Sequence, residues 1–351
     1  MNQLTDDAIA LLKRMISTPS FSKEEGDTAN LLQQFLTERE ITVNRHLNNI
    51  WAVNKHFDPK KPTILLNSHH DTVRPNDGYS RDPFTPEVKN GKLFGLGSND
   101  AGGPLTALIA AFIHFYPQKN LSYNLLLAAT AEEEISGDNG IASILDKIPD
   151  ISCAIVGEPT QMRMATAEKG LMVLECTAHG QSGHAARNEG INAIYIAMED
   201  INWIQNYQFS EVSSALGPVK MTITEIDAGN QHNVVPDICH FTVDIRSTDA
   251  YTNSEILRTL KNEIKSEINA RSIRLNPSSI SDDHPLVQAG KELDIKTYGS
   301  PTLSDQSLIS VPSLKMGPGK SARSHTADEF IQLKEIQDGI DIYIKHLERI
   351  I

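Results

Sequence analysis

Three short apolar segments of this sequence each end in side chains that can bind a metal ion. The segment TILLNSH, at 63–69, ends in His69, and NLLLAATAEEE, at 124–134, ends in Glu134. The third segment, ISCAIVGE at 151–158, ends in Glu158. Helical patterns separate these strand-like runs, and this alternation predicts a mainly parallel sheet. Because open α/β sheets bind ligands at the carboxyl ends of their strands, we expect the three side chains at one edge.

The length and the order of the predicted elements indicate two domains. A chain of 351 residues exceeds the usual size of one compact domain. Residues 1–165 and 280–351 have α/β character, which predicts a mainly parallel sheet with helices on both faces. Residues 166–279 follow a strand-helix-strand-strand-helix order, so we expect a smaller α+β domain inserted into the first.

Hydrophobic periodicity also predicts where individual helices lie. Helices are expected near 141–146, at 253–268 and at 330–350. The segment 74–99 is rich in proline, glycine and aspartate, and it is expected to be a long loop. Loops of this length are often functional.

Charge and cysteine usage exclude several classes of protein. The 45 acidic and 32 basic residues give a formal net charge of -13, so neither nucleic acid nor an anionic membrane is an expected partner. The apolar stretch at 105–115 is too short to span a bilayer, and the N-terminal helix pattern starts with acids, unlike a secretory signal. The three cysteines are far apart, which argues against a disulfide framework. These features favour a cytoplasmic protein whose metal ligands are histidines and carboxylates.

The motif SHHDT places His69 and Asp71 two residues apart at the end of the first strand. In a strand this spacing directs both side chains to the same face. A carboxylate behind a ligating imidazole fixes its tautomer, so we expect His69 to be the ligand and Asp71 to orient it. His70 points to the other face and is expected to be structural.

The run Glu132, Glu133 and Glu134 puts three carboxylates at the end of the second strand, where cations or water must offset their repulsion. Neighbouring glutamates can divide the roles of metal ligand and general base. The alternative is a solvated acidic start of a helix. Glu158, held between a glycine and a proline, is the candidate at the third strand.

Two further candidates lie beside glycines. Asp100, in LGSNDAGG, is either a ligand or a helix N-cap. His325 lies in GPGKSARSHTADEF before the last predicted helix. Asp328 and Glu329 are expected in the first turn of that helix, where they would interact with its dipole. The potential ligands together supply donors for two divalent cations, which indicates a two-metal hydrolase: His69, Asp100, Glu134, Glu158 and His325.

Five ordered motifs resemble those of the co-catalytic zinc aminoacylase and carboxypeptidase family, which includes acetylornithine deacetylase, succinyl-diaminopimelate desuccinylase and carboxypeptidase G. The resemblance covers nearly the whole chain. SHHDT resembles the family's first metal motif, LGSNDAGG its bridging-aspartate motif and TAEEEISG its double-glutamate motif. VGEPT resembles the motif of the next ligand, and SHTADEF that of the last histidine.

The resemblance implies a role for each of these residues. Asp100 would bridge two zinc ions, and the peptide bond after it would be cis. His69 and Glu158 would complete the ligand set of one zinc ion, and Glu134 and His325 that of the other. Glu133 would be the general base, with Asp71 in its orienting role. Relatives often have Asp-Glu-Glu where this chain has three glutamates, so Glu132 is the alternative base.

The inserted domain carries three polar candidates that resemble the family's substrate and lid positions: His184 in GQSGHAA, Asn233 in NVVPD and Arg246 in VDIR. Arg246 suits a substrate carboxylate because its planar guanidinium can pair with both oxygens. The alternatives are a strand salt bridge for Arg246 and a turn before proline for Asn233. The resemblance implies a homodimer in which His184 acts at the partner subunit's active site.

The resemblance is strongest to acetylornithine deacetylase. It implies removal of an N2-acyl group from ornithine or a related amino acid during arginine biosynthesis, with acetylornithine, succinylornithine and acetylcitrulline as candidate substrates. The same ligands would also suit cobalt or manganese. A di- or tripeptidase or a carboxypeptidase of the same family is the alternative enzyme. A metal-bound but inactive interaction protein is the alternative of a different class.

Overall fold

Strand pairing and helix packing divide the chain into two structural units. The computed structural model describes residues 3–351. Unit 1 comprises the described residues up to Thr166 together with Ser279–Tyr298 and Ser304–Ile351. Unit 2 comprises Ala167–Ser278 and Gly299–Leu303. The short segment Gly299–Leu303 thus groups with unit 2, although it lies beyond the expected insertion.

Unit 1 contains a layer of helices and a large mixed sheet. Its α-helices are α1 (Gln3–Ile16), α2 (Gly26–Thr37), α3 (Gly103–Phe115), α6 (Pro285–Glu292) and α7 (Leu333–Glu348). The strands of the large sheet are β1 (Asn44–His46), β2 (Asn49–Val53), β3 (Thr63–His69), β6 (Asn124–Thr130), β7 (Cys153–Val156), β8 (Met164–Glu168), β15 (Ser278–Ser279), β16 (Thr297–Ser300) and β17 (Ser313–Lys315). One end of each of β8, β15 and β16 belongs to unit 2. A small separate sheet contains β4 (Glu87–Lys89), β5 (Lys92–Phe94) and β18 (Phe330–Gln332).

The centre of the large sheet is parallel. The strand order is β1-β2-β6-β3-β7-β17-β8-β15, with β16 paired to β8. β3 pairs in parallel with β6 on one side and with β7 on the other, and β17 is parallel to β7. Antiparallel pairs lie further out, such as β2 with β6. This arrangement confirms the predicted α/β class with a mainly parallel sheet.

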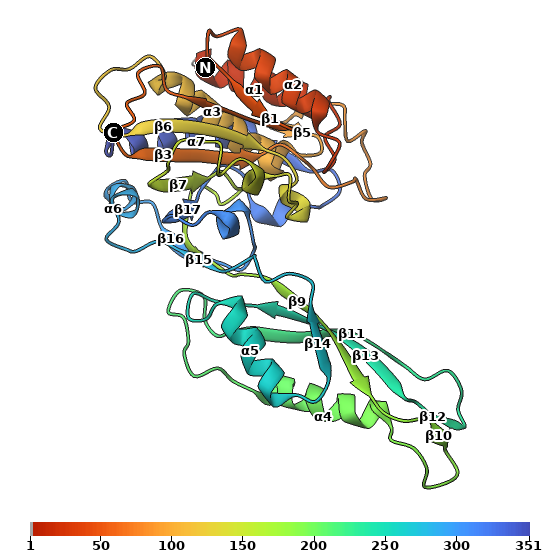
Figure 1. Cartoon of the computed structure of the whole chain (residues 1–351). Helices are drawn as coiled ribbons and strands as arrows, with labels where there is room; N and C mark the ends of the chain where they lie inside the picture. Colours follow the sequence, from red (N-terminus) through yellow and green to blue (C-terminus); the bar gives the residue numbers. More distant parts are fainter. Residues whose placement is uncertain (1–2) are drawn as a thin grey trace. The chain divides into compact units, whose positions relative to one another are not determined.

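Both faces of this sheet are buried. Ile64 and Leu66 of β3 face a core shared with α1, α2, α3 and α7. Leu65 faces a second core that includes Ile144 and Ile309, where short 3-10 helices cover the sheet. Because neither face is exposed, β3 is a continuous apolar run and not an alternating one. Figure 1 shows α1, α2 and α3 over one face of the sheet.

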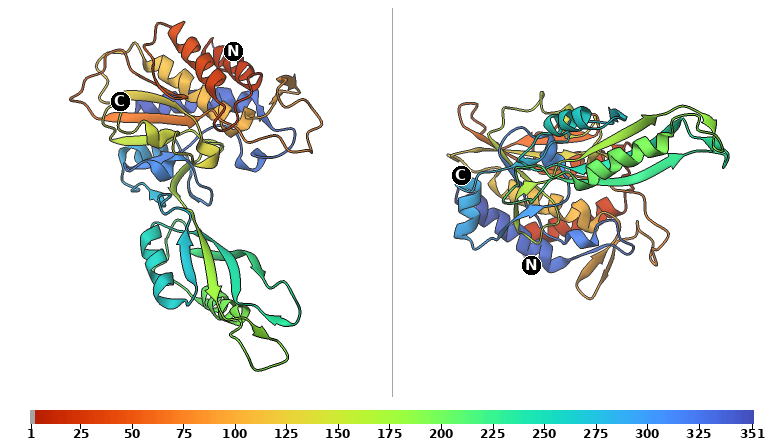
Figure 2. Two further views of the ribbon diagram at one scale, coloured as in Figure 1. Left: turned by 45° about the vertical axis from the view of Figure 1, so that its right-hand side comes forward. Right: turned by 90° about the horizontal axis from the view of Figure 1, so that it is seen from below.

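Unit 2 is built on an antiparallel sheet in the order β11-β13-β9-β14, packed against two helices. Its elements are β9 (Met172–His179), β10 (Gly183–His184), α4 (Ala193–Asn206), β11 (Lys220–Ala228), β12 (Val234–Val235), β13 (Ile238–Arg246), α5 (Asn253–Glu263) and β14 (Glu267–Ala270). Leu174 and Cys176 of β9 are buried, whereas the intervening Glu175 is exposed, as expected for a half-buried strand. Figure 2 shows from two further directions that the β10–β12 pair extends from one end of this sheet. No helix within residues 3–351 is long and apolar enough to cross a membrane.

Two expectations for unit 1 are wrong because the small sheet forms there. The segment 74–99, expected to be a loop, contains β4 and β5. The helix expected at 330–350 begins only at Leu333, because Phe330–Gln332 pair with β5 as β18. Phe330 also contacts Phe94, with 5.4 Å between the ring centroids. Pairing with a distant strand therefore prevails over the local helical pattern.

Two other predicted helices are shorter than expected. The helix near 141–146 is a single 3-10 turn, Ile141–Ser143. The helix expected at 253–268 ends at Glu263 and is followed by β14. The buried carboxylate of Asp200 accepts hydrogen bonds from the backbone N–H groups of Lys265 (3.0 Å) and Ser266 (2.8 Å). This contact from α4 holds the backbone in the turn that leads into β14.

The buried His346 is expected to make the stability of the protein sensitive to acid. It is buried in α7, its Nε2 lies 2.7 Å from the backbone carbonyl of Leu286, and burial lowers its pKa below the ordinary value. The unfolded chain therefore binds a proton near pH 6.5 that the folded chain does not bind, so stability is lost as the pH falls below about 6.5. We expect His346→Gln, which keeps a donor for Leu286, to lose less stability than the wild type between pH 7 and pH 5.

Urea unfolding of the metal-free protein at the two pH values measures this difference. His56→Gln, at an exposed position, is the matched control and should behave like the wild type. An equal loss of stability in His346→Gln and the wild type would contradict the assignment.

Candidate metal centre

The five predicted ligands come from strand ends and loops of unit 1. His69 is the last residue of β3, Glu134 lies in a one-turn helix after β6, and Glu158 follows β7. Asp100 comes from the turn Ser98–Gly102 before α3, and His325 from the loop between β17 and β18. The structure brings these side chains together. The Asp100–Ala101 peptide bond is cis, as the resemblance implied.

Candidate donor atoms form two groups, within each of which all atoms lie less than 4.8 Å apart. One group contains His69, Asp100 and Glu134, and the other contains His69, Glu133 and Glu158. His325 is in neither group, but it contacts the first, because its Nε2 lies 2.9 Å from Oε2 of Glu134.

Asp100 lies between the two histidines. Its Oδ1 is 3.4 Å from Nε2 of His69, and its Oδ2 is 3.8 Å from Nε2 of His325. Oε1 of Glu158 is also 3.8 Å from Nε2 of His69. Two ligands that each lie about 2.1 Å from a tetrahedral zinc ion are about 3.4 Å apart. The spacing of these donors therefore fits divalent-cation ligation.

The charge of the cluster also fits a cation. Burial lowers the pKa of His69, but Glu133, Asp100 and Asp71 outweigh this effect and hold that pKa well above its ordinary value. The hydrogen bond with Glu134 raises the pKa of His325 to about 9. Several carboxylates so close together repel one another unless positive charge lies between them. Imidazole and carboxylate donors are those that zinc, cobalt and manganese accept in proteins.

Asp71 contacts His69 and also holds the turn that follows β6. Its Oδ1 lies 3.4 Å from Nδ1 of His69, and its backbone carbonyl lies closer, at 3.0 Å. The two carboxylate oxygens accept hydrogen bonds from the backbone N–H groups of Glu133 (3.1 Å) and Glu134 (3.2 Å). The Ser22 hydroxyl donates a third, at 2.7 Å. The sequence indicated the contact with His69, but not the anchoring of the glutamate turn.

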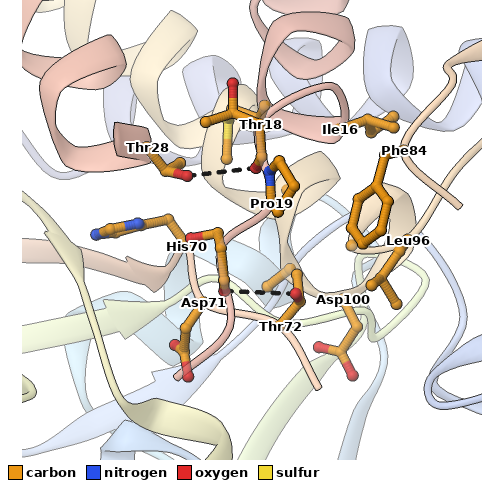
Figure 3. Close-up of a pocket in the computed structure, with 15 residues that line it drawn as sticks. Ile16, Thr18, Pro19, Thr28, His70, Asp71, Thr72, Phe84, Leu96 and Asp100 are labelled. Atoms are coloured by element: carbon orange, nitrogen blue, oxygen red, sulfur yellow. Dashed lines mark hydrogen bonds between the residues drawn. The ribbon is translucent and has the colours of Figure 1, made fainter. Parts of the chain in front are cut away.

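His70 points away from the cluster. Its ring is buried, and its Nε2 lies 2.9 Å from the backbone carbonyl of Asn48. Figure 3 shows the carboxyl groups of Asp71 and Asp100 extending to one side, whereas His70 extends in another direction. The cavity in that view has a volume of about 20 Å³. This is room for about one water molecule, so the cavity is not a substrate pocket.

The first two glutamates of the run have different surroundings. Glu132 has a left-handed φ of 54°, and its carboxylate accepts a hydrogen bond from Nδ2 of Asn139 at 2.9 Å. Glu133 instead lies 3.8 Å from Nε2 of His69. Burial raises the pKa of Glu133 well above its ordinary value, and neighbouring carboxylates add to the increase while His69 opposes it. Glu133 therefore lies beside His69 in the cluster, whereas Glu132 is turned to Asn139.

The expected dipole roles of Asp328 and Glu329 are wrong, because both residues precede β18 and lie outside α7. Asp328 accepts a hydrogen bond from the backbone N–H of Ser80 at 2.9 Å. Glu329 is buried against the turn that carries Asp100, and burial together with the Asp100 charge raises its pKa to about 8. Its sequence position beside the last helix concealed this contact.

Asp305 is a buried carboxylate near the cluster that the sequence did not indicate. Its Oδ2 accepts hydrogen bonds from Nδ2 of Asn67 in β3 and from the hydroxyl of Thr130 in β6, both at 2.8 Å. Burial raises its pKa to about 6. The partners lie 238 and 175 residues away in the sequence, so no local pattern could reveal the contact.

The three polar candidates of unit 2 occupy two places. His184 is in β10, and Asn233 lies beside it because its carbonyl accepts the backbone N–H of Ala185 at 3.0 Å. Arg246 is the last residue of β13, whereas the first residue of that strand, Ile238, follows β12 by three positions. It forms a paired contact with Asp244, at 2.9 and 3.2 Å, which is the salt bridge of the alternative interpretation. The structure does not bring Arg246 together with His184 and Asn233.

Carboxylates and imidazoles clustered at the carboxyl edge of a parallel sheet are the ligand set of a metal-dependent hydrolase. A family model described as "Peptidase family M20/M25/M40" matches residues 65–349. The chain belongs to this family, whose members include hydrolases of amide bonds.

Relatives of known sequence and structure cover most of the chain. Acetylornithine deacetylase of Klebsiella pneumoniae is 30% identical over 370 residues, which cover 94% of each chain. Succinyl-diaminopimelate desuccinylase of Cereibacter sphaeroides is 28% identical and covers 73% of this chain and 72% of its own. The crystal structure of aminopeptidase PepT from Bacillus cereus has a TM-score of 0.78 at 17% identity, covering 99% of this chain and 98% of that one. An M20 family metallo-carboxypeptidase from Sulfolobus solfataricus has a TM-score of 0.73 at 17% identity, covering 100% and 99%. At such identities the two structures show the fold alone.

His69 belongs to both groups of donors, so its removal should weaken metal binding most clearly. We expect His69→Ala to bind zinc at least ~10-fold more weakly than the wild type, since even residues behind a ligand typically contribute that much. His70→Gln is the matched control, because the neighbouring ring faces Asn48. Zinc titration of the metal-free protein against a chromophoric chelator measures both. Equal affinity of His69→Ala and the wild type would remove His69 from the ligand set.

Proposed function

We propose that this protein removes the N2-acyl group from an amino acid, with N-acetylornithine as the leading substrate, giving ornithine and acetate in arginine biosynthesis. The observation that carries this proposal is the 30% identity to acetylornithine deacetylase over 94% of both chains. Succinylornithine and acetylcitrulline are the closest alternatives. The negative net charge does not repel a cationic ornithine side chain.

Two zinc ions are the proposed cofactor, with cobalt or manganese as alternatives. Asp100 would help to hold both ions, because its two oxygens face different histidines. His69 and Glu158 would hold one ion, and Glu134 and His325 the other. When bound, such ions supply Lewis-acid activation of a water molecule and of the substrate carbonyl.

Glu133 is the proposed general base. The support is its place beside His69 and its raised pKa, which makes the carboxylate a better proton acceptor. Glu133 takes a proton from the attacking water and delivers it to the leaving nitrogen of the amide. Asp71 keeps His69 and the glutamate turn in place during this transfer.

Polar residues of unit 2 are proposed to bind the substrate. Arg246 would pair with a substrate carboxylate in place of Asp244, to which its guanidinium is now paired. His184 and Asn233 are exposed side by side at the β10–β12 pair, where they are accessible to a second subunit. We propose that they act at the active site of the partner in a homodimer.

The surface of unit 2 supports the proposed homodimer. Tyr195, Met198 and Ile226 expose 66%, 57% and 57% of their surface, which is unusual for large apolar side chains. The first two lie on α4, which packs beside β11, and β11 is an edge strand of its sheet. An edge strand with adjoining apolar side chains is suited to association with a second copy.

A cytoplasmic location is also proposed. All three cysteines of the chain are free and buried, as suits a reducing compartment. No nucleic acid or membrane surface is expected as a partner of so acidic a protein.

A peptidase is the second candidate, because the solved structures of similar fold include an aminopeptidase and a carboxypeptidase. A substrate screen decides between the two. We expect the zinc-loaded protein to hydrolyse acetylornithine, succinylornithine or acetylcitrulline with a higher kcat/KM than any dipeptide or tripeptide. Preference for peptides would favour the second candidate. No turnover of any of these substrates would favour a metal-bound interaction protein.

Replacing the proposed base should abolish turnover without removing metal. We expect Glu133→Gln to lower kcat at least ~100-fold while the protein retains the zinc content of the wild type. Glu132→Gln tests the alternative base and should lower kcat much less, because that carboxylate contacts Asn139. Measuring kcat and zinc content on the same samples separates the two roles. A large loss only in Glu132→Gln would reverse the assignment.

Charges placed on the apolar surface of unit 2 should separate the subunits. We expect Tyr195→Glu with Met198→Glu to convert a dimer to a monomer in analytical ultracentrifugation, because the added carboxylates would be buried in the interface. Asn262→Glu, at an exposed position on α5, is the matched control and should stay dimeric. A wild-type protein that sediments as a monomer would refute the homodimer.

A further inference from the structure

Glu329 makes unusually many contacts with a part of the backbone that carries a proposed ligand. Its side chain is 2% exposed. One carboxylate oxygen accepts hydrogen bonds from the backbone N–H groups of Asn99 (2.7 Å) and Asp100 (2.9 Å), and the other accepts one from Gly97 (3.0 Å). The backbone carbonyl of Glu329 accepts a fourth, from Gly95 at 3.0 Å.

These contacts would be costly to lose. The backbone at Asp100 is non-helical, so the N–H groups around it are not all paired by regular secondary structure. Glu329 accepts hydrogen bonds from three of these backbone N–H groups, those of Gly97, Asn99 and Asp100, in a buried place that offers little access to water. A buried carboxylate near the Asp100 carboxylate is itself unfavourable, so the hydrogen bonds must offset a substantial cost.

Glu329 also connects two proposed ligands. It follows His325 by four residues in the sequence, and its carboxylate holds the segment that ends in Asp100. Asn99 ties the same two segments a second time, because its side chain donates to the carbonyl of Lys320 (3.1 Å) and accepts the N–H of Lys320 (2.9 Å). The Asp100 turn is thus fixed against the His325 loop at two points.

We propose that Glu329 is a positioning residue of the metal centre, whose carboxylate sets the place of Asp100 by holding the backbone of the turn that carries it. The inference rests on the proposed ligand role of Asp100. Glu329 does not touch the metal or the substrate in this proposal. Asp71 has the equivalent role for another turn, because its carboxylate accepts hydrogen bonds from the backbone N–H groups of Glu133 and Glu134.

Three variants test whether the carboxyl group of Glu329 and its reach are both needed. Glu329→Gln keeps the length of the side chain, but one carboxyl oxygen becomes an NH2 group, which cannot accept a hydrogen bond from a backbone N–H. Glu329→Asp keeps a carboxyl group, but its shorter side chain cannot reach all three N–H groups. Asp328→Asn is the matched control, since the neighbouring carboxylate binds the backbone of Ser80 and not the Asp100 turn. Asn also tolerates the left-handed φ of 53° at that position.

Zinc titration of the metal-free proteins against a chelator tests the proposal. We expect zinc to bind ~10- to 100-fold more weakly to Glu329→Gln and to Glu329→Asp, the loss typical for a residue that orients a ligand. Asp328→Asn should bind zinc as the wild type does. The metal-free variants should keep the cooperative thermal unfolding of the wild type, although at a lower midpoint, which shows that weaker zinc binding is not a consequence of unfolding.

Wild-type zinc affinity in Glu329→Gln would overturn the proposal. Wild-type affinity in Glu329→Asp would also overturn it, because the three hydrogen bonds that need the length of glutamate would then not matter for zinc binding. If Glu329→Gln does not fold, Glu329→Asp carries the test by the same criterion.

The titration uses zinc alone and no substrate, so its result does not depend on the proposed reaction. A wild-type protein that binds no zinc would refute the metal centre itself. A wild-type protein that binds zinc but hydrolyses no acyl-amino acid would refute the proposed substrate class and leave the role of Glu329 standing.

Discussion

The parallel pairing of β3 with β6 and β7 is the constraint on which the metal centre depends. It sets three carboxyl ends side by side, so that His69, Glu133 and Glu158 leave the sheet at one edge. Apolar side chains bury both faces of these strands, and a shift of one residue in register would turn His69 to the opposite face. The packing of the core therefore determines where the polar ligands emerge.

Buried carboxylates that are not candidate ligands give the cluster its shape. Asp71 holds the turn after β6, Glu329 holds the turn before α3, and Asp305 ties β3 to β6. Burying a carboxylate is costly unless donors surround it, and each of these has backbone or side-chain donors. The hydrogen bonds that offset this cost also hold the neighbouring metal-ligand candidates in place. The protein's own hydrogen bonds therefore fix the positions of these ligand atoms.

Local patterns predicted the ligand-bearing strands well, because each is an apolar run that ends in a distinctive polar residue. The wrong boundaries have a common cause. Residues 330–332 pair with β5 and residues 267–270 pair with β9, although both segments continue a helical periodicity. The same periodicity predicts Glu329 in the first turn of the last helix, although it precedes β18. In each case the segment forms a strand because it pairs with a strand that is far away in the sequence. Local periodicity carries no information about such a distant partner.

By itself the sequence determined the parallel α/β class, the strand ends that carry His69, Glu134 and Glu158, and the motifs of the peptidase family. Only the tertiary structure decided that Glu133 faces His69 while Glu132 turns to Asn139, and that the two oxygens of Asp100 face different histidines. Residue type and spacing are local properties of the chain. The partner of a buried polar atom depends instead on which distant segments the apolar core brings into contact.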